Sequence, residues 1–430
     1  MPKNTAVASA ARAPDSRRRS RGRSRGLWLL GPALVAGVAY LDPGNVASNM
    51  TAGAQYGYLL VWVVLAGNIM AWLIQYLSAK LGVVTGRSLA EVIGERLHST
   101  WGRRAYWLQA ELVVMATDLA EVIGGAVALN LLFGIPLLMG GIITGTVSML
   151  LLFVQSRRGP RHFEFVVVGL MAIITIGFVV GVFVAPPDPA GVARGMLPRF
   201  EDTGSVLLAA SILGATIMPH AIYAHSALAR DRFGSSWTRG EATDAARTEP
   251  SRIRLLLTAT RWDVTIAMVI AGSVNLCILL LAAANLANVS GTDSLEGAHA
   301  ALTTGLGSVV ATCFAVGLLA SGLASTSVGA YAGAEIMHGL LRVRVPLLIR
   351  RLVTLIPALV VLGLNVDPTR ALILSQVVLS FGIPFALIPL VILTAQRRTL
   401  GIYANRPWTT IAGATASALL ITLNATLLCL

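Results

Sequence analysis

Two short stretches place polar and sulfur-bearing side chains among apolar residues. Residues 40–46 read YLDPGNV, within an apolar run that begins near Trp28, and residues 211–226 read SILGATIMPHAIYAHS. A carboxylate beside Pro-Gly is costly inside a membrane helix, because proline removes a backbone donor and the charge needs a partner. Each break also frees backbone carbonyls, which a bound cation can satisfy. The two stretches therefore predict a cation site between two interrupted helices.

The residue types at the breaks indicate which cation would bind. Asp42 and Asn45 supply a carboxylate and an amide oxygen three residues apart, so that both can turn toward one point. In the second stretch, Met218 lies beside freed carbonyls such as that of Ala215. Oxygen ligands suit hard and borderline cations alike, whereas a thioether favours softer transition metals over Mg²⁺ and Ca²⁺. This set predicts a site for Mn²⁺, Fe²⁺ or a similar divalent ion.

A third group of chemically active residues lies in the third apolar run. Glu111, Asp118 and Glu121 are spaced by seven and three residues, which places all three near one helical face. Acids in a membrane span need water or a partner, and Arg350 and Arg351, at the start of a later span, can pair with them. The pattern indicates either a path for protons or a structural cluster of ion pairs.

Two histidines follow the second break. His220 lies two residues after Met218, and His225 lies five residues further on. An imidazole exchanges protons near neutral pH, but a histidine in a membrane span can also form a hydrogen-bonded link between helices. Both interpretations stay open.

The elements that must position these residues are membrane helices. The chain is 55% hydrophobic and only 12% charged, whereas soluble proteins are typically about a quarter charged. Apolar runs long enough to cross a hydrocarbon core recur along the chain. The sequence predicts about eleven spans, at residues 28–56, 58–84, 105–133, 135–155, 162–185, 203–229, 256–286, 307–340, 350–364, 367–395 and 408–429.

The distribution of basic residues predicts the orientation of these spans. The net charge is +13, but all except three of the 33 Lys and Arg residues fall in alternate connections and the adjoining helix ends. The exceptions are Arg194, Arg199 and Arg370. This asymmetry places the N-terminus in the cytoplasm and the C-terminus outside a cell inner membrane. It also explains the basic charge without a nucleic-acid partner.

The positions of the two breaks predict the domain organisation. They fall in spans 1 and 6, so spans 1–5 and 6–10 form two halves, each with an odd number of helices and therefore inserted in opposite directions. Inverted repeats with interrupted helices in matching positions are typical of transporters with a site at the bilayer midplane. We expect a disordered basic tail over residues 1–26, repeats over residues 27–200 and 201–400, and a further helix over residues 401–430.

Several motifs resemble one known family. DPGN in span 1, MPH in span 6 and ATDLAEVIGGAVALNLLFG in span 3 are similar to signatures of the NRAMP family (natural resistance-associated macrophage proteins). LSAKLGVVTGRSLAE, ASTSVGAYAG and LSQVVLSFGIPFALIPL match as well, and the likeness covers residues 27–428 almost continuously. The resemblance implies an all-α membrane protein with the LeuT-type inverted repeat. It also implies import of Mn²⁺ or Fe²⁺, with Co²⁺ and Cd²⁺ as further ions, coupled to protons.

The resemblance assigns roles by position. It implies metal ligation by Asp42, Asn45, the Ala215 carbonyl and Met218, and it adds Gln376 of span 10. It implies that protons leave through a pathway formed by Asp42, Glu111, Asp118, Glu121, His220, His225, Arg350 and Arg351. The chain departs from the family pattern at Ala221, where the family usually has Asn, and at Leu323, which replaces a polar residue.

Three other functions are alternatives to this interpretation. A transporter of the same architecture that moves an amino acid with Na⁺ or H⁺ would present backbone amides, not a carboxylate, to its substrate. A cation channel with broken helices predicts an oligomeric pore, which the two halves within one chain disfavour. An enzyme is not expected, because the sequence has no nucleophile motif, phosphate loop or Cys/His cluster. We expect no prosthetic group and a functional monomer in the lipid bilayer.

Overall fold

The structure is a computed structural model that describes residues 32–158, 169, 172–173, 175–176, 178–233, 250–287, 289–343 and 345–429. Within these ranges every regular element is a helix. The basic tail of residues 1–26, predicted to be disordered, and most of the predicted span 162–185 lie outside the described residues.

Long helices follow the predicted spans closely. The uninterrupted ones are α4 (Val61–Thr85), α6 (Thr100–Phe133), α7 (Leu137–Arg158), α13 (Pro250–Asn285), α15 (Ser308–Leu341), α16 (Leu347–Gly363), α17 (Pro368–Ala395) and α19 (Pro407–Cys429). Among the described residues, 7 stretches are long and apolar enough to cross a membrane. Their ends differ from the predicted spans by a few residues, because helices continue beyond the apolar run into polar surroundings.

Two of the predicted spans are interrupted. The first consists of α2 (Pro32–Ala39) and α3 (Pro43–Tyr56), and the sixth of α10 (Thr203–Thr216) and α11 (Pro219–Phe233). In each case the second helix begins with a proline, whose missing N–H is tolerated in the first turn but not in a helix interior. Both breaks therefore have a local cause in the sequence.

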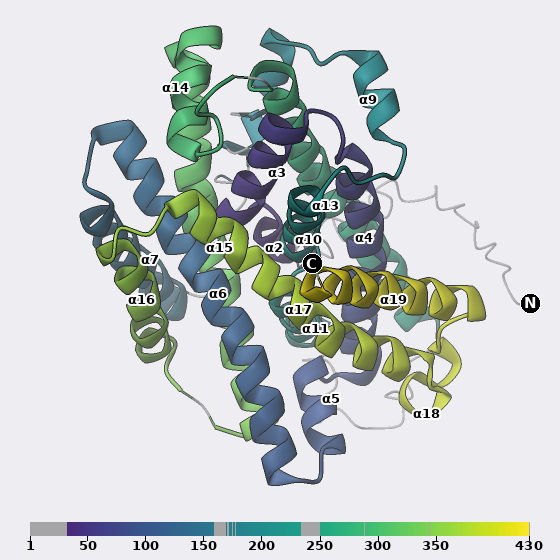
Figure 1. Ribbon diagram of the computed structural model, residues 1–430. Coiled ribbons are helices and arrows are strands. Elements are labelled where there is room, and N and C mark those ends of the chain that lie inside the picture. The colour runs from purple at the N-terminus through teal and green to yellow at the C-terminus, as the bar shows by residue number, and fades with distance from the viewer. Residues whose placement is uncertain are drawn as a thin grey trace, which may run out of the picture.

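Short helices lie at the two ends of the bundle (Figure 1). At one end are α5 (Leu89–Arg96), α18 (Arg397–Leu400) and the 3₁₀ helix η2 (Gly401–Tyr403), and at the other are α9 (Pro189–Gly195) and α14 (Leu295–Leu306). These helices are absent from the predicted spans, because they are too short to cross a bilayer. A sequence signature for α5 does exist, since Ser88 and Glu91 form a capping box at its start.

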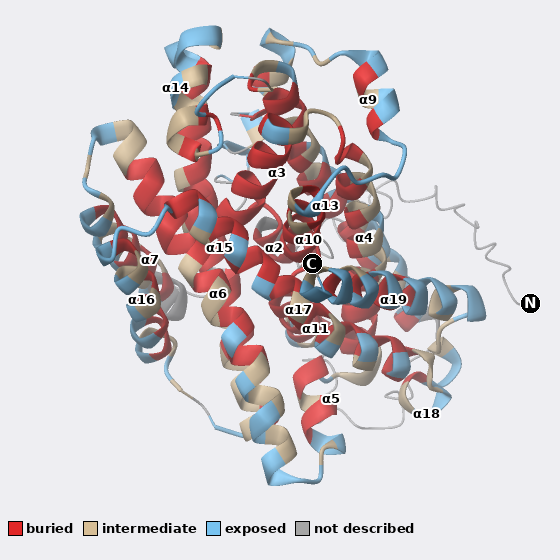
Figure 2. Ribbon diagram, viewed as in Figure 1, coloured by how far each residue is buried: buried red, intermediate tan, exposed pale blue. Residues whose placement is uncertain are grey.

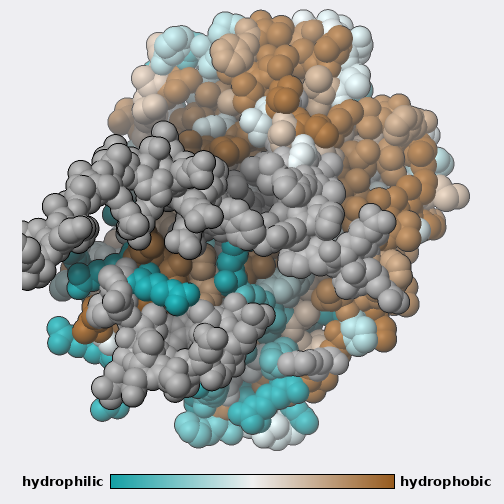
Figure 3. Space-filling view, turned by 180° about the vertical axis from the view of Figure 1, so that it is seen from behind, coloured by the Kyte–Doolittle hydropathy of each residue, from teal (hydrophilic) through white to brown (hydrophobic). Residues whose placement is uncertain are grey.

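Packing places both breaks at the centre of the bundle. Helix α3 packs on α13 and α10, α10 packs on α17, and α6 packs on α15. Buried residues fill this centre, whereas α16 and α19 present exposed faces at the periphery (Figure 2). Many of the exposed side chains are large and apolar, such as Phe183 and Trp408, and Figure 3 shows wide apolar areas on the outer surface with hydrophilic residues gathered toward one end. Such a surface suits contact with lipid.

Candidate metal-binding site

Asp42 forms the turn between α2 and α3 and caps the second helix. Its backbone is extended, with φ −73° and ψ 162°, and its carboxylate accepts hydrogen bonds from the amides of Gly44 (3.2 Å) and Asn45 (2.9 Å). An acidic N-cap satisfies amides that have no partner within the helix. The DPGN run therefore both breaks the span and fixes the carboxylate at the break.

The second break exposes a carbonyl for a reason that the sequence makes explicit. Helix α10 ends at Thr216, Ile217 and Met218 lie between the helices, and α11 begins at Pro219. In a continuous helix the Ala215 carbonyl would accept a hydrogen bond from the amide four residues later. That residue is Pro219, which has no N–H. The Ala215 carbonyl is thus free to accept another partner, and the adjacent Met218 is completely buried.

Asn45 joins the two breaks. Its side-chain amide donates one hydrogen bond to the Tyr40 carbonyl (2.9 Å) and another to the Ala215 carbonyl (2.8 Å). Each acceptor belongs to a different interrupted helix. Asn45 therefore holds the two breaks together through carbonyls that ordinary helices would have used internally.

Gln376 of α17 also reaches the place where the two breaks meet. Its Nε2 donates to Asp42 Oδ2 at 3.2 Å. This approach requires glycine at two places. A Cβ on Gly44 would lie 1.8 Å from Gln376 Nε2, and a Cβ on Gly214 would lie 2.0 Å from the Gln376 carbonyl oxygen. Because real Cβ atoms do not come so close, larger residues at either position would displace Gln376.

Two side-chain oxygen atoms of the predicted metal ligands lack hydrogen-bond donors within the described part of the chain. They are Asn45 Oδ1 and Gln376 Oε1. Asp42, Asn45, Met218 and Gln376 each have 0% of their surface exposed, and a buried oxygen without a partner is rare and costly. No cluster of three or more His, Cys, Asp or Glu side chains suited to a metal occurs among the described residues. The junction instead offers one carboxylate, two amides, the Ala215 carbonyl, which lacks its helical partner and is bonded by Asn45, and a thioether, which together can receive a cation.

Further polar residues support the first break and were not predicted as site residues. Ser321 of α15 donates to the Leu41 carbonyl, and Asn275 of α13 donates to the Tyr40 carbonyl at 3.1 Å. Both side chains satisfy carbonyls released between α2 and α3. The only sign of them in the sequence is a polar residue inside a long apolar span, which is too common to identify a site.

The two histidines of α11 contact different helices. His220 Nδ1 lies 3.1 Å from Thr117 Oγ1 of α6, and His225 Nδ1 lies 2.7 Å from Gln75 Oε1 of α4. Gln75 also donates to the Tyr40 hydroxyl, beside the first break. Both histidines are 1% exposed. They form hydrogen-bonded links between helices, and a part in proton movement stays a prediction.

The three acids of α6 lie opposite the two arginines of α16. Arg351 contacts Asp118 at 2.6 Å and Glu121 at 3.1 Å, and Arg350 contacts Glu111 at 2.7 Å. All five residues are buried. The guanidinium groups thus compensate most of the negative charge that α6 brings into the bundle.

Side chains from four helices, α6, α7, α15 and α16, meet around Arg351. Its guanidinium also donates to Ser148 of α7 (3.2 Å) and to Thr326 of α15 (3.3 Å). The second carboxylate oxygens of Asp118 and Glu121, Oδ2 and Oε1, have no partner among the described residues. Each of these two oxygen atoms can therefore accept a further hydrogen bond or a proton.

Comparisons with known proteins agree over nearly the whole chain. The family model described as natural resistance-associated macrophage protein-like (Nramp) matches residues 33–430. The divalent metal cation transporter MntH of Mycobacterium tuberculosis (strain ATCC 25618 / H37Rv) is 57% identical over 401 residues, which is 93% of this chain and 91% of that protein. The MntH of Bacillus subtilis (strain 168) is 45% identical over 409 residues, covering 94% and 93%.

Solved structures show the same likeness in three dimensions. A crystal structure of the Eremococcus coleocola manganese transporter, in complex with an aromatic bis-isothiourea substituted compound, is similar with a TM-score of 0.82 at 31% identity, covering 96% of this chain and 87% of that one. The nucleobase-cation-symport-1 family transporter MHP1 has a TM-score of 0.60 at 15% identity, covering 93% and 92%, and shares the fold alone. The predicted fold class, an all-α membrane protein with a LeuT-type inverted repeat and interrupted helices 1 and 6, is confirmed.

Proposed function

Since this chain belongs to the Nramp family of membrane transporters and is not an enzyme, we propose that it imports divalent transition metal ions together with protons by alternating access. Manganese and iron are the expected substrates, and Co²⁺ and Cd²⁺ would also bind. The names of the relatives support a divalent metal cation as substrate. The choice of ion and the coupling to protons rest on the chemistry of the site.

The single observation that carries this proposal is the set of unsatisfied oxygens around Asp42. A bound cation would give Asn45 Oδ1 and Gln376 Oε1 the partner that they lack. The Asp42 carboxylate would supply the negative charge. To accept the metal, the Ala215 carbonyl would exchange the hydrogen bond from Asn45 (2.8 Å) for the ion.

Met218 is proposed to decide which divalent ions are transported. It is fully buried in the interval between α10 and α11, close to the Ala215 carbonyl, which lacks a partner within its own helix. A thioether contributes little to binding Mg²⁺ or Ca²⁺, which prefer oxygen, but it stabilises softer transition metals. The ligand set proposed is Asp42, Asn45, the Ala215 carbonyl, Met218 and Gln376.

The acid cluster on α6 is proposed to carry protons away from the metal site. When a metal displaces the proton of Asp42, a nearby group must receive it. His220 contacts Thr117 of α6, one residue before Asp118, and so connects the second break to this helix. From Asp118 and Glu121 the route continues along α6 past Arg351 to Glu111. His225 and Arg350 complete the proposed set.

A change of conformation is required for this function. The proposed ligands have no exposed surface, so the site is closed to solvent in this structure. Rocking of the interrupted helices α2/α3 and α10/α11 would open it to each side in turn. We further propose that the N-terminus is cytoplasmic and the C-terminus external, that the protein resides in the plasma membrane, and that it functions as a monomer.

The main alternative, transport of an amino acid with Na⁺ or H⁺, has less support. The helix N-terminus at the first break, which would attract a substrate carboxylate, is already capped by Asp42. A second negative group at this place would be repelled. A channel is disfavoured by the closed, fully buried site.

Uptake of Mn²⁺ into proteoliposomes tests the proposal. We expect uptake that is faster at acidic than at neutral external pH, persists in excess Mg²⁺ and Ca²⁺, and is lost in Asp42→Asn. Uptake that is independent of external pH would contradict proton coupling. Uptake that excess Mg²⁺ abolishes would contradict the role of Met218.

A further inference from the structure

A groove on the membrane-facing surface between α4 and α13 has features of a lipid site. It lies on the outer side of these helices and consists of two adjoining hollows that share Trp72 and Thr265. The first hollow has a volume of about 320 Å³ and the second of about 560 Å³. Both volumes fall within the range of about 300–1,000 Å³ that is typical of ligand clefts.

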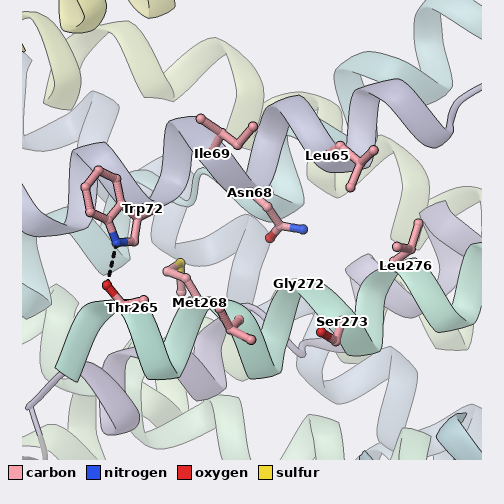
Figure 4. Close-up of a pocket in the computed structure, with 10 residues that line it drawn as sticks. Leu65, Asn68, Ile69, Trp72, Thr265, Met268, Gly272, Ser273 and Leu276 are labelled. Carbon is pink, nitrogen blue, oxygen red and sulfur yellow. Dashed lines mark hydrogen bonds between the residues drawn. The ribbon is translucent and has the colours of Figure 1, made fainter. Parts of the chain in front are cut away.

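The first hollow is mainly apolar and follows the helix axes. Its lining includes Leu65, Ile69, Met268, Val269 and Leu276. Figure 4 shows these helices side by side, with the hydrogen bond from Trp72 Nε1 to Thr265 Oγ1 (2.9 Å) connecting them at one end. Ile69 and Val269 are 70% and 61% exposed. An elongated apolar hollow of this kind is complementary to an acyl chain.

The second hollow is aromatic and basic. The Arg261 guanidinium lies over the Trp72 ring, 5.8 Å from its centroid, and Trp72 stacks on Tyr76. Trp262, next to Arg261, is 62% exposed. Tryptophan, tyrosine and arginine together are typical of the zone where a membrane meets water. This hollow is therefore complementary to a lipid headgroup.

Arg261 has no acidic partner within the described part of the chain, although Asp263 is only two residues away. The Asp263 carboxylate accepts a hydrogen bond from the Ala33 amide (2.9 Å), at the beginning of α2. Arg254, seven residues before Arg261 and so near the same face of α13, is exposed as well. No carboxylate lines either hollow. The charge of the groove thus favours an anionic headgroup over one that also carries an ammonium.

Asn68 adds a polar side chain to the first, mainly apolar hollow. Its amide projects from α4 toward Gly272 of α13 (Figure 4), where a Cβ would come within 2.5 Å of Asn68 Nδ2. The described residues offer this amide no hydrogen-bond partner. Asn68 lies four residues from Trp72, which is about 6 Å along a helix. An amide at this distance from the headgroup position can donate to the ester carbonyl of a lipid.

We propose that the α4/α13 groove binds one anionic phospholipid, with its phosphate at Arg261, an ester carbonyl at Asn68 and an acyl chain along Ile69 and Val269. In the orientation proposed above, Arg261 faces the cytoplasmic leaflet, because the adjacent Asp263 contacts the start of α2. The opposite face of α13 contacts α2, since a Cβ on Gly37 would lie 3.1 Å from Ala267 Cβ. The lipid would therefore contact the outer face of α13, whose inner face packs on α2 next to the first break.

Photo-crosslinking in liposomes tests this proposal without measuring transport. The bilayer would be mostly phosphatidylcholine, with a small fraction of phosphatidylglycerol that carries a diazirine on its acyl chain. Peptide mapping is expected to find label on α4 and α13 near Ile69 and Val269. Arg261→Gln is expected to reduce this label about fivefold, the factor that corresponds to the loss of one basic contact with an anionic lipid.

Two further variants sharpen the test. Arg104→Gln is the matched control, because Arg104 also lies over a tryptophan, 5.6 Å from the Trp101 ring, but on α6. It should leave the groove label unchanged. Val269→Trp should remove the label by filling the exposed hollow without disturbing the core.

Three results would overturn the proposal. Equal labelling by diazirine-bearing phosphatidylcholine would show that the groove does not recognise an anionic headgroup. Equal labelling of wild type and Arg261→Gln would remove Arg261 from the site. Absence of label combined with a dimeric mass in the membrane would mean that a second copy of the chain occupies the groove.

Discussion

Two buried carboxylates in this protein, Asp42 and Asp118, have opposite surroundings. Asp42 accepts hydrogen bonds only from neutral donors, namely the Gly44 and Asn45 amides and Gln376 Nε2. Among the described residues no Lys, Arg or His lies within ion-pair distance of it. Asp118 instead contacts the Arg351 guanidinium at 2.6 Å.

This difference indicates which carboxylate is available to a metal. A buried carboxylate paired with arginine is already compensated, and a divalent cation beside it would also be repelled by the guanidinium. A carboxylate held by neutral groups still attracts a cation. This contrast supports the proposal that metal binds at the junction of the breaks and that protons move through the acid cluster on α6.

The largest expected effect separates these two carboxylates directly. Asp42→Asn should weaken Mn²⁺ binding by more than about 100-fold, because it removes the only charged ligand while preserving side-chain size. Asp118→Asn, the matched control, should leave the dissociation constant nearly unchanged. Isothermal titration of both purified variants measures this. Equal losses in the two variants would contradict the assignment.

The acid cluster should respond most to the loss of its arginine. Arg351→Gln is expected to lower the free energy of unfolding by about 3–5 kcal/mol, because it leaves Asp118 and Glu121 buried without a counter-charge. Unfolding in mixed micelles measures the change. The exposed Arg370→Gln serves as control, and adding Asp118→Asn to Arg351→Gln should recover part of the loss. A loss no greater than that of the control would mean that Arg351 does not compensate these acids.

Met218 should affect selectivity more than affinity. Met218→Ala is expected to reduce the preference for Mn²⁺ over Ca²⁺ by about tenfold, since it removes the soft ligand but leaves the oxygens. Competition of Ca²⁺ against Mn²⁺ uptake measures the preference. Met50→Ala removes another buried methionine, in α3, and should not change it. If Met218→Ala excluded Ca²⁺ as well as wild type does, the thioether would not be the selective group.

The smallest expected effect concerns an ion pair outside the membrane spans. Glu91 of α5 contacts Arg230 at 2.8 Å, and its side chain is 24% exposed. Partial burial alone would raise the pKa of Glu91. The hydrogen bond from the Ser88 amide and the charge of the nearby Arg230 guanidinium have a larger, opposite effect, so that the pKa lies below its ordinary value. Such partly exposed pairs contribute no more than about 1 kcal/mol.

The sign of the pH dependence follows from this lowered pKa. Glu91 contributes stability above its unfolded-state pKa, and this contribution is lost as the pH falls through the lower pKa of the folded state. Melting temperatures of wild type should therefore approach those of Glu91→Gln as the medium is acidified below the ordinary range of a glutamate pKa. A difference that grows on acidification would contradict this account.

The sequence predicted most of the fold for physical reasons, and it also identified the two breaks whose residues meet in the structure. Membrane spans can be predicted because crossing the hydrocarbon core requires long apolar runs. The breaks can be predicted because Pro43 and Pro219 interrupt two of these runs. The contacts between helices that are distant in the sequence could not be predicted from it. Nothing in the sequence predicts that Asn45 donates to the Ala215 carbonyl, or that Gly44 is needed for the approach of Gln376, because both depend on how α3, α10 and α17 pack.

X-ray absorption of bound Cd²⁺ tests the central claim most directly. The acid cluster on α6 contains no sulfur, whereas the junction of the breaks contains Met218. We expect one sulfur ligand among oxygen ligands in the wild type, and an environment without sulfur in Met218→Ala. An all-oxygen environment in the wild type would contradict the proposal that the metal binds between the two interrupted helices with Met218 as a ligand.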